Sequence, residues 1–320
     1  LLTREKVLQG AAEIREGQSF CLSLPLDVPG GNALNPRRFP PVLHPTQRDG
    51  KPNMNYPMSR ADPRFVDVVN DDAVFLHLQY STHWDSLCHV GQMFDSDADG
   101  KPEIVYYNGY RGHEDILSPI DYRNGNEKPV AGPYGARKLG VENMARAGVQ
   151  GRAVMIDLYA HFPGQGKAVG YDDLMRIMDA DKVDVQRGDM VCLRTGFDRM
   201  LLGMNKQPDA DLLHASSPGL AGRDEKLLRW ITDVGLVSLI SDNFGVEIFP
   251  PQAGHTPYHA RLPLHEHCLF KIGVNLGELW YLSELADWLR QQGRSRFFLT
   301  APPLNLPGAV GAPATPIGTV

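Results

Sequence analysis

The sequence predicts an α/β fold, because strand patterns and helix patterns alternate along its second half. Three apolar runs have the length of buried strands, and two amphipathic segments between them have the length of helices. The strands are predicted at 153–159, 190–195 and 236–240, and the helices at 171–180 and 224–233. The first half contains too much strand for a simple doubly wound sheet.

The first sixty residues are predicted to hold one helix, one strand and a long segment without a pattern. Thr3 can cap a helix that runs to about Glu16 and ends at Gly17. A strand at 20–26 follows. Residues 28–60 are rich in Pro, Gly and Asn and show little periodicity, which indicates a long loop or an arm that lies on the body or on another subunit.

The end of the chain is predicted to add a helix and a strand to the same domain. Ser283 can cap a helix with an apolar stripe, and Gly293 ends it. A strand at 296–300 leads into a proline-rich tail. We therefore expect residues 1–320 to form a single domain, with the arm or loop at about 28–60 as its irregular part.

Composition excludes several classes of partner. The 320 residues are 42% hydrophobic and 22% charged, with a formal net charge of -6, which is typical of an ordinary globular protein. An acidic surface attracts neither nucleic acid nor an anionic membrane, so we expect a small-molecule substrate. No membrane span or signal peptide is visible, and the four well-separated cysteines favour a reducing compartment, so a cytoplasmic location is expected.

Chemistry-bearing side chains alternate with apolar ones in a strand predicted at about 73–85. Successive side chains of a strand point to opposite faces. One face would carry Leu76, Leu78, Tyr80 and Trp84, and the other His77, Gln79, Ser81, His83 and Asp85. His83 and Asp85 would lie roughly 6.6 Å apart at their Cα atoms, so their side chains can converge on one ion or one substrate atom. Trp84 is expected to belong to the core.

A third chemical group follows closely, because a short turn after Asp85 could bring His89 back over the same point. Three groups of the types that divalent transition metals prefer then lie within seven positions. An ordinary hydrogen-bonded His–Asp pair is the alternative. A helix would instead place Asp85 off the common face, and Tyr80, Thr82 and Trp84 favour a strand. The agreement of pattern and ligand chemistry favours a functional site.

The same segment resembles the signature of the cyclase family, which includes bacterial kynurenine formamidases and isatin hydrolases. The family pattern is H-x-G-T-H-x-D-x-P-x-H, and Thr82, His83, Asp85 and His89 match it. Gln79 stands where the family has its first histidine. The resemblance implies that Gln79, His83 and Asp85 lie near a catalytic Zn or Mn ion and that His89 is the acid/base that moves protons. A carboxamide oxygen is a weaker ligand than imidazole for such ions.

Further motifs extend the resemblance over most of the chain. Segments 20–26, 188–196 and 217–220 are similar to family strands and to the start of a family helix. In two-metal members, a His and a Glu about a dozen residues apart bind a second ion that shares the bridging Asp. His265 and Glu278 match that pair by position, although the neighbouring Glu266 and His267 blur the register. A solvated helix end rich in His and Glu is the alternative.

The resemblance implies a swivelling β/β/α fold, assembled as a homodimer or homotetramer. It also implies a metal-dependent hydrolase that opens an amide, lactam or lactone of a small cyclic or aromatic substrate with metal-activated water. Two alternatives remain open. One is a metal-free cyclase or dehydratase that uses His83, Asp85 and His89 for acid–base chemistry, which the Gln79 departure favours. The other is a non-catalytic member of the family.

Overall fold

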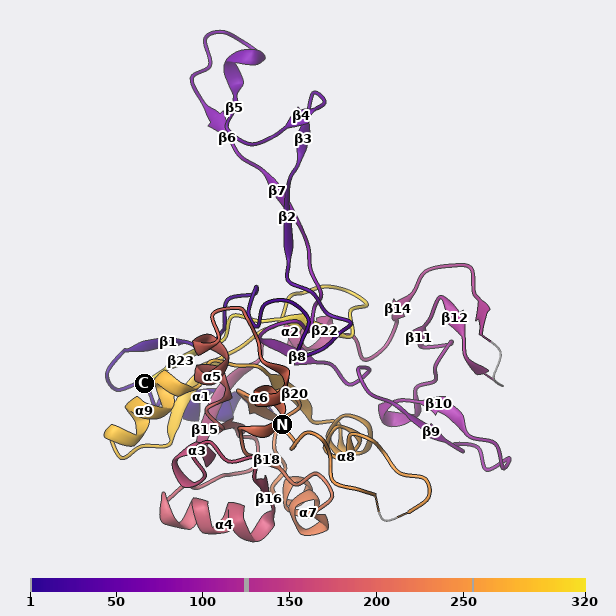
Figure 1. Ribbon diagram of the computed structural model, residues 1–320, viewed down its shortest axis with the longest axis vertical. Helices are drawn as coiled ribbons and strands as arrows, with labels where there is room; N and C mark the ends of the chain where they lie inside the picture. Colours follow the sequence, from indigo (N-terminus) through magenta and orange to yellow (C-terminus); the bar gives the residue numbers. More distant parts are fainter. Residues whose placement is uncertain (1, 124–126, 255) are drawn as a thin grey trace.

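One large sheet organises the computed structural model, which describes residues 2–123, 127–254 and 256–320 (Figure 1). Nine strands of the described residues form this sheet. In spatial order they are β1 (Ser19–Cys21), β23 (Ile317–Thr319), β21 (Arg296–Thr300), β15 (Gln150–Asp157), β17 (Met190–Arg194), β19 (Ser238–Ser241), β20 (Asn275–Glu278), β8 (His83–Asp85) and β22 (Gly311–Pro313).

The centre of the sheet is parallel and its flanks are antiparallel. β15, β17, β19 and β20 pair in parallel, as expected when helices connect neighbouring strands. β21 pairs antiparallel with β15, and β8 pairs antiparallel with β20. The predicted α/β class is confirmed. The proline-rich tail, for which no strand was predicted, supplies the two strands β22 and β23.

Helices cover the two faces of the sheet, and several match the predicted segments. The helices are α1 (Arg4–Ala11), α2 (Glu142–Ala147), α3 (Leu158–His161), α4 (Tyr171–Ala180), α5 (Phe197–Gly203), α6 (Ala210–Ala215), α7 (Glu225–Val234), α8 (Pro263–His265) and α9 (Ser283–Gln291), and a π-helical segment, η4 (Glu266–Ile272), follows α8. Thr3 caps α1 by accepting a hydrogen bond from the backbone of Lys6. The helix ends at Ala11 and not near Glu16, because the chain then turns and Glu13 joins Arg294 and Arg296 on the body.

The cap of α9 differs from the prediction that Ser283 caps it. Asp198, on α5, accepts hydrogen bonds from the backbone N–H groups of Leu282 and Ser283 and from the Ser283 hydroxyl. A carboxylate at that position satisfies the free N–H groups of the first turn and suits the positive end of the helix. The cap therefore comes from a distant element, which the local sequence could not reveal.

Apolar side chains form a core on each face of the sheet. Along β15, Val154 and Ile156 join the core beneath α4 and α7, whereas Ala153 and Met155 join the core beneath α9. This alternation is the period of two that a strand imposes. Both cores exclude water, since all four side chains are at most 4% exposed. The sheet between them is therefore a rigid support for the side chains that its strands carry.

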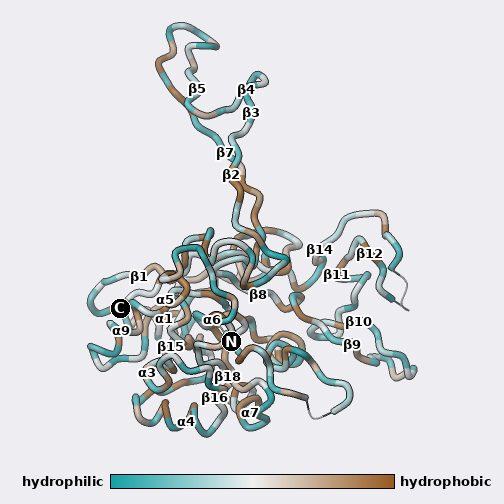
Figure 2. The backbone as a smooth tube through the Cα atoms, viewed as in Figure 1, coloured by the Kyte–Doolittle hydropathy of each residue, from teal (hydrophilic) through white to brown (hydrophobic). Residues whose placement is uncertain are grey.

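A long hairpin arm projects from the body (Figure 1). Its stem pairs β2 (Val42–Pro45) with β7 (Asp72–Phe75), and its tip holds β3 (Gln47–Arg48), β4 (Lys51–Pro52), β5 (Tyr56–Pro57), the 3-10 turn η1 (Met58–Arg60) and β6 (Val68–Val69). Apolar colour runs along the stem in Figure 2. The irregular segment was expected at 28–60; in the structure Val28 and Leu34 are buried against the body, and the arm continues to Phe75.

Short hairpins from the part of the sequence that follows the arm and precedes α2 form a second extension, on the right of Figure 1. They are built from β9 (Gln92–Phe94), β10 (Glu103–Val105), the 3-10 turn η2 (Tyr107–Gly109), β11 (Ile116–Leu117), β12 (Ile120–Asp121), β13 (Lys128–Pro129) and β14 (Gly135–Ala136). A further pair, β16 (Ala168–Val169) with β18 (Gly219–Leu220), lies near α4. Within the described part of the chain, no helix has the length and apolar character needed to cross a membrane.

The prediction of a single strand at 73–85 is wrong, because β7 pairs with β2 in the arm and ends at Phe75, whereas β8 begins at His83 in the main sheet. The Tyr80 N–H donates to the His77 carbonyl in a turn, and the Gln79 carbonyl accepts from Arg38. Thr82 binds the backbone of Leu24 and Leu279. The Tyr80 N–H and the Gln79 carbonyl are therefore satisfied by a turn and by a side chain, and not by a neighbouring strand. The strict alternation holds only within β8.

Candidate metal centre

Two neighbouring strands place three ionisable side chains at one point. β8 and β20 are antiparallel, and His83 lies opposite Glu278 in their register. His83 and Asp85 stand two positions apart on β8 and share a face. Trp84, between them, points to the other side and packs edge-on against Trp280 with 5.0 Å between ring centroids. The side chains that carry the chemistry are thus fixed by a packed strand.

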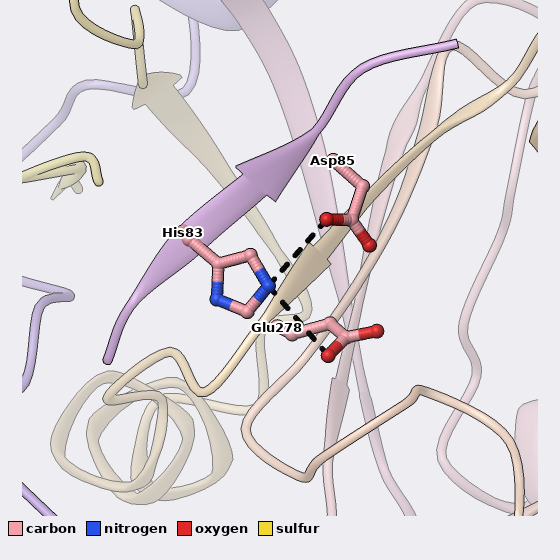
Figure 3. A group of neighbouring side chains, drawn as sticks. All are labelled: His83, Asp85 and Glu278. Carbon is pink, nitrogen blue, oxygen red and sulfur yellow. Dashed lines mark ion pairs between the residues drawn. The ribbon is translucent and has the colours of Figure 1, made fainter. Parts of the chain in front are cut away.

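The three groups converge within one coordination sphere (Figure 3). His83 Nε2 lies 3.6 Å from Asp85 Oδ1 and 3.7 Å from Glu278 Oε2. One ligand atom from each residue lies within 4.8 Å of the other two. All three side chains are at most 4% exposed. Such spacing is too long for good hydrogen bonds and leaves room for an ion between the atoms.

Several polar atoms at this point have no hydrogen-bond partner. His83 Nε2 and both carboxylate oxygens of Asp85 are buried and unpaired among the described residues. Leaving such groups unsatisfied costs about 1–3 kcal/mol each, and more when they are charged. His83 Nδ1 lies 2.7 Å from the Ser81 carbonyl, so Nδ1 carries the proton and Nε2 turns its lone pair to the cluster. The donor set fits a divalent cation of the zinc or manganese type.

His265 extends the cluster on the far side of Glu278. Its Nε2 lies 3.0 Å from Glu278 Oε1 and 3.9 Å from Asp85 Oδ2, and its Nδ1 lies 2.9 Å from Glu247 Oε1. Burial opposes a charge on His265, but the hydrogen bonds to Glu247 and Glu278 prevail and raise its pKa to about 10. Burial likewise opposes the Glu278 charge, and the His265 bond overcomes it, lowering the Glu278 pKa to about 2. A cation at His265 therefore balances the two carboxylates.

His89 is the most accessible imidazole of the group, with its side chain 21% exposed. Its Nε2 lies 3.7 Å from Asp85 Oδ1, and its Nδ1 lies 3.5 Å from the amide nitrogen of Gln79. Burial and then the charge of His265 lower the pKa of His89 to about 3, so the ring is neutral at physiological pH. The neutral imidazole lies at the open side of the site, in position for proton transfer to a substrate.

The structure gathers most of the predicted site residues. His83, Asp85, His89, His265 and Glu278 form one cluster, and Gln79 contacts it through His89.

The ambiguous neighbours of His265 point elsewhere. His267 binds the Thr232 hydroxyl, and Glu266 pairs with Lys271. Of these three neighbouring residues, His265 is the one whose side chain faces Asp85 and Glu278.

Sequence reasoning missed Glu247. Its carboxylate accepts from the backbone N–H groups of Leu264 and His265 as well as facing the His265 ring. This contact fixes which nitrogen of His265 turns toward Asp85 and Glu278. Glu247 lies 18 positions before His265 in a loop, and the one available signal was an acid within an otherwise apolar segment.

Fold and site together define a mixed α/β protein with a buried His–Asp–Glu centre on two adjacent strands of its main sheet, β8 and β20. A family model described as Cyclase matches residues 22–248. The chain belongs to the cyclase family, as its signature predicted. No curated protein sequence matches the chain.

Solved structures share this fold over nearly the whole chain. A protein described as a novel cyclase is 27% identical, with 100% of this chain and 94% of that chain covered and a TM-score of 0.72. Isatin hydrolase A from Ralstonia solanacearum is 15% identical, with 94% and 91% covered and a TM-score of 0.55. A predicted metal-dependent hydrolase from Bacillus stearothermophilus is 17% identical, with 95% and 98% covered and a TM-score of 0.51. The swivelling β/β/α fold expected from the resemblance is confirmed.

Proposed function

We propose that this protein is a metal-dependent hydrolase that opens an amide, lactam or lactone bond of a small cyclic or aromatic substrate. The observation that carries the proposal is the convergence of three buried, unpartnered donor atoms from His83 and Asp85 beside Glu278. Burying these donor atoms without a partner is destabilising, and a divalent cation would give them one. The hydrolase descriptions of the structural neighbours support the same class.

Zinc or manganese is the proposed ion, because the donors combine imidazole nitrogen with carboxylate oxygen. His83, Asp85 and Glu278 would hold one ion. His265 and Glu278, with the second Asp85 oxygen, offer a position for another after the His265 proton is displaced. When bound, the cation supplies an acidified water near neutral pH and polarises the substrate carbonyl.

The remaining steps belong to the side chains around the centre. His89, neutral and partly open, would carry a proton to the leaving nitrogen or oxygen. Gln79, 3.5 Å from His89 Nδ1, holds the ring in place. This is the usual division of work in hydrolysis: one group generates the nucleophile and another protonates the leaving group.

Arg38 supplies a cation on the open side of the centre. One of its guanidinium nitrogens donates to the Gln79 carbonyl at 2.7 Å, and among the described residues it has no acidic partner. Its charge reaches the site: burial, opposed by Glu278 and reinforced by Arg38, lowers the pKa of His83 to about 4. We infer that Arg38 favours substrates with a carbonyl or carboxylate oxygen beside the scissile bond.

Turnover of a substrate panel tests the proposal. The metal-loaded protein should hydrolyse at least one of a formamide, an isatin-like lactam and a lactone, and a chelator should abolish that activity. Activity that survives complete metal removal would instead support the metal-free cyclase or dehydratase alternative. No turnover by a metal-loaded protein with any member of the panel would support the non-catalytic alternative.

Gln79→His tests the one departure from the family signature. If the Gln79 amide oxygen is a weak ligand, the new imidazole should raise affinity for zinc-like ions, by roughly tenfold or more. If Gln79 acts only through His89 or the substrate, metal affinity should stay constant and turnover should fall. A chelator competition titration beside a kinetic assay decides. Unchanged affinity and unchanged turnover would place Gln79 outside the site.

We also propose that the protein is a homodimer or homotetramer in which the arm contacts a neighbouring copy. Val42, Leu43, Val74 and Phe75 of its stem are 48–69% exposed, although an isolated two-stranded hairpin is marginally stable in water. Light scattering should give at least twice the 35.4 kDa chain mass at micromolar concentration.

Charged substitutions in the stem provide the control. Leu43→Glu with Phe75→Glu should shift the protein to a monomer, because two charges would be buried at the contact. Tyr258→Glu, at a side chain 95% exposed and outside the arm, should not. A wild-type monomer at micromolar concentration would contradict the proposal.

A further inference from the structure

A cavity of about 640 Å³ lies apart from the metal centre, between α2 with the segment before it and the first residues of β19 and β20. Leu87, Met144 and Val237 give it apolar walls, and the Trp84 side chain, turned away from the metal centre, contributes to the wall as well. Its volume is within the range of about 300–1,000 Å³ that small-molecule sites occupy. None of the five clustered residues of the metal centre lines it.

A buried hydroxyl without a partner lines this cavity. Ser238 begins β19, is 1% exposed, and its Oγ has no hydrogen-bond partner among the described residues. A buried hydroxyl that makes no hydrogen bond is destabilising by about 1–3 kcal/mol. The amide nitrogen of the neighbouring Asn275 is engaged elsewhere, since it donates to the Asp85 carbonyl at 3.0 Å. An acceptor atom of a ligand in the cavity would satisfy Ser238.

Two unpaired cations stand at one side of the same cavity. Arg146 is neutralised locally, since it binds Asn143 at 3.1 Å and lies 3.8 Å from Glu142. Arg137 and Lys138 also line the cavity, and in the described parts of the chain neither side chain has an acidic or hydrogen-bonding partner. Two free cations beside an apolar space favour an anion with an apolar body.

We propose that this cavity binds a small aromatic carboxylate that carries a second hydrogen-bond acceptor. The carboxylate is held by Arg137 and Lys138, the ring packs between the apolar walls, and the second acceptor receives the Ser238 hydroxyl proton. The carboxylate is inferred from the two free cations, the ring from the apolar space, and the second acceptor from the unpartnered hydroxyl.

Calorimetric titration of the full-length protein with 4-hydroxybenzoate tests the proposal. Saturable binding is expected both in the protein as purified and after removal of bound metal. Arg137→Gln with Lys138→Gln should weaken it about tenfold, the equivalent of one lost charge-assisted contact. Lys51→Gln with Lys128→Gln, which removes two exposed lysines elsewhere, should leave it unchanged.

Ser238→Ala provides a second, independent arm. The substitution should weaken the binding of 4-hydroxybenzoate but not the binding of benzoate, which lacks the second acceptor. A general loss of folding would weaken the binding of both ligands. The proposal is overturned by absent saturable binding, by equal binding of neutral 4-hydroxybenzyl alcohol, by binding that ignores all these substitutions, or by binding that requires the metal. No turnover is measured, so failure of the proposed hydrolase function would leave this test valid.

Discussion

His83→Ala is expected to lose the bound ion and to lower hydrolytic activity by more than about a hundredfold, because removing a direct ligand exceeds the 10–100-fold effect of disturbing an outer contact. His83 contributes an unpartnered Nε2 lone pair to the centre, and its ring orientation is set by the Ser81 carbonyl. Alanine has no side-chain nitrogen and so cannot bind the ion. Elemental analysis and steady-state kinetics on the purified variant measure the two losses.

His77→Ala is the matched control. His77 lies in the same segment but contacts Phe39 and Phe75 at the base of the arm, outside the cluster. It should keep the ion and the activity. A His83→Ala protein that is active and retains its full complement of metal would remove His83 from the proposed centre.

Trp84→Ala is expected to destabilise the fold by about 3–5 kcal/mol, the usual range for emptying a buried tryptophan site. Trp84 is fully buried, packs against Trp280 and donates its indole N–H to the Ala301 carbonyl at 2.8 Å. The substitution therefore creates a cavity and also leaves a buried carbonyl without its donor. Denaturant unfolding followed by circular dichroism gives the change in free energy.

Tyr134→Ala serves as the comparison for that measurement. Its side chain is 80% exposed, so the free energy of unfolding should change by less than about 0.5 kcal/mol. If Trp84→Ala lowered the free energy of unfolding by less than about 1 kcal/mol, β8 would not be anchored as the structure indicates. The sheet would then not be a rigid support for the metal centre.

The elements that local pattern predicted best are those with a clear period and a nearby stop signal. The helix Tyr171–Ala180 and the strand Arg296–Thr300 have the predicted bounds, because an amphipathic stripe and a short apolar run are sufficient to define them. The proline-rich end was predicted as a tail, yet Gly311–Pro313 forms a strand on the edge of the sheet, where proline is tolerated. Edge strands depend on a partner that local sequence does not show.

The site residues likewise include some that local pattern could predict and some that it could not. His83 and Asp85 could be found from alternation on one strand, but His265 and Glu278 were found only through the family resemblance. Glu247 was not predicted, because its role follows from a contact made by folding and not from any spacing. The segment before His83 shows the limit of alternation as a signal. The apolar/polar pattern continues through residues that the folded chain holds in a turn, with Arg38 bound to the Gln79 carbonyl.

The metal content of the purified wild-type protein tests the central claim most directly. After growth in medium supplemented with zinc and manganese, elemental analysis should find about one or more divalent ions per chain, in line with the donor set of His83, Asp85 and Glu278. Chelation should remove both the ion and the hydrolysis, and adding the ion back should restore them. Well under one ion per chain, or hydrolysis that persists without metal, would contradict the account.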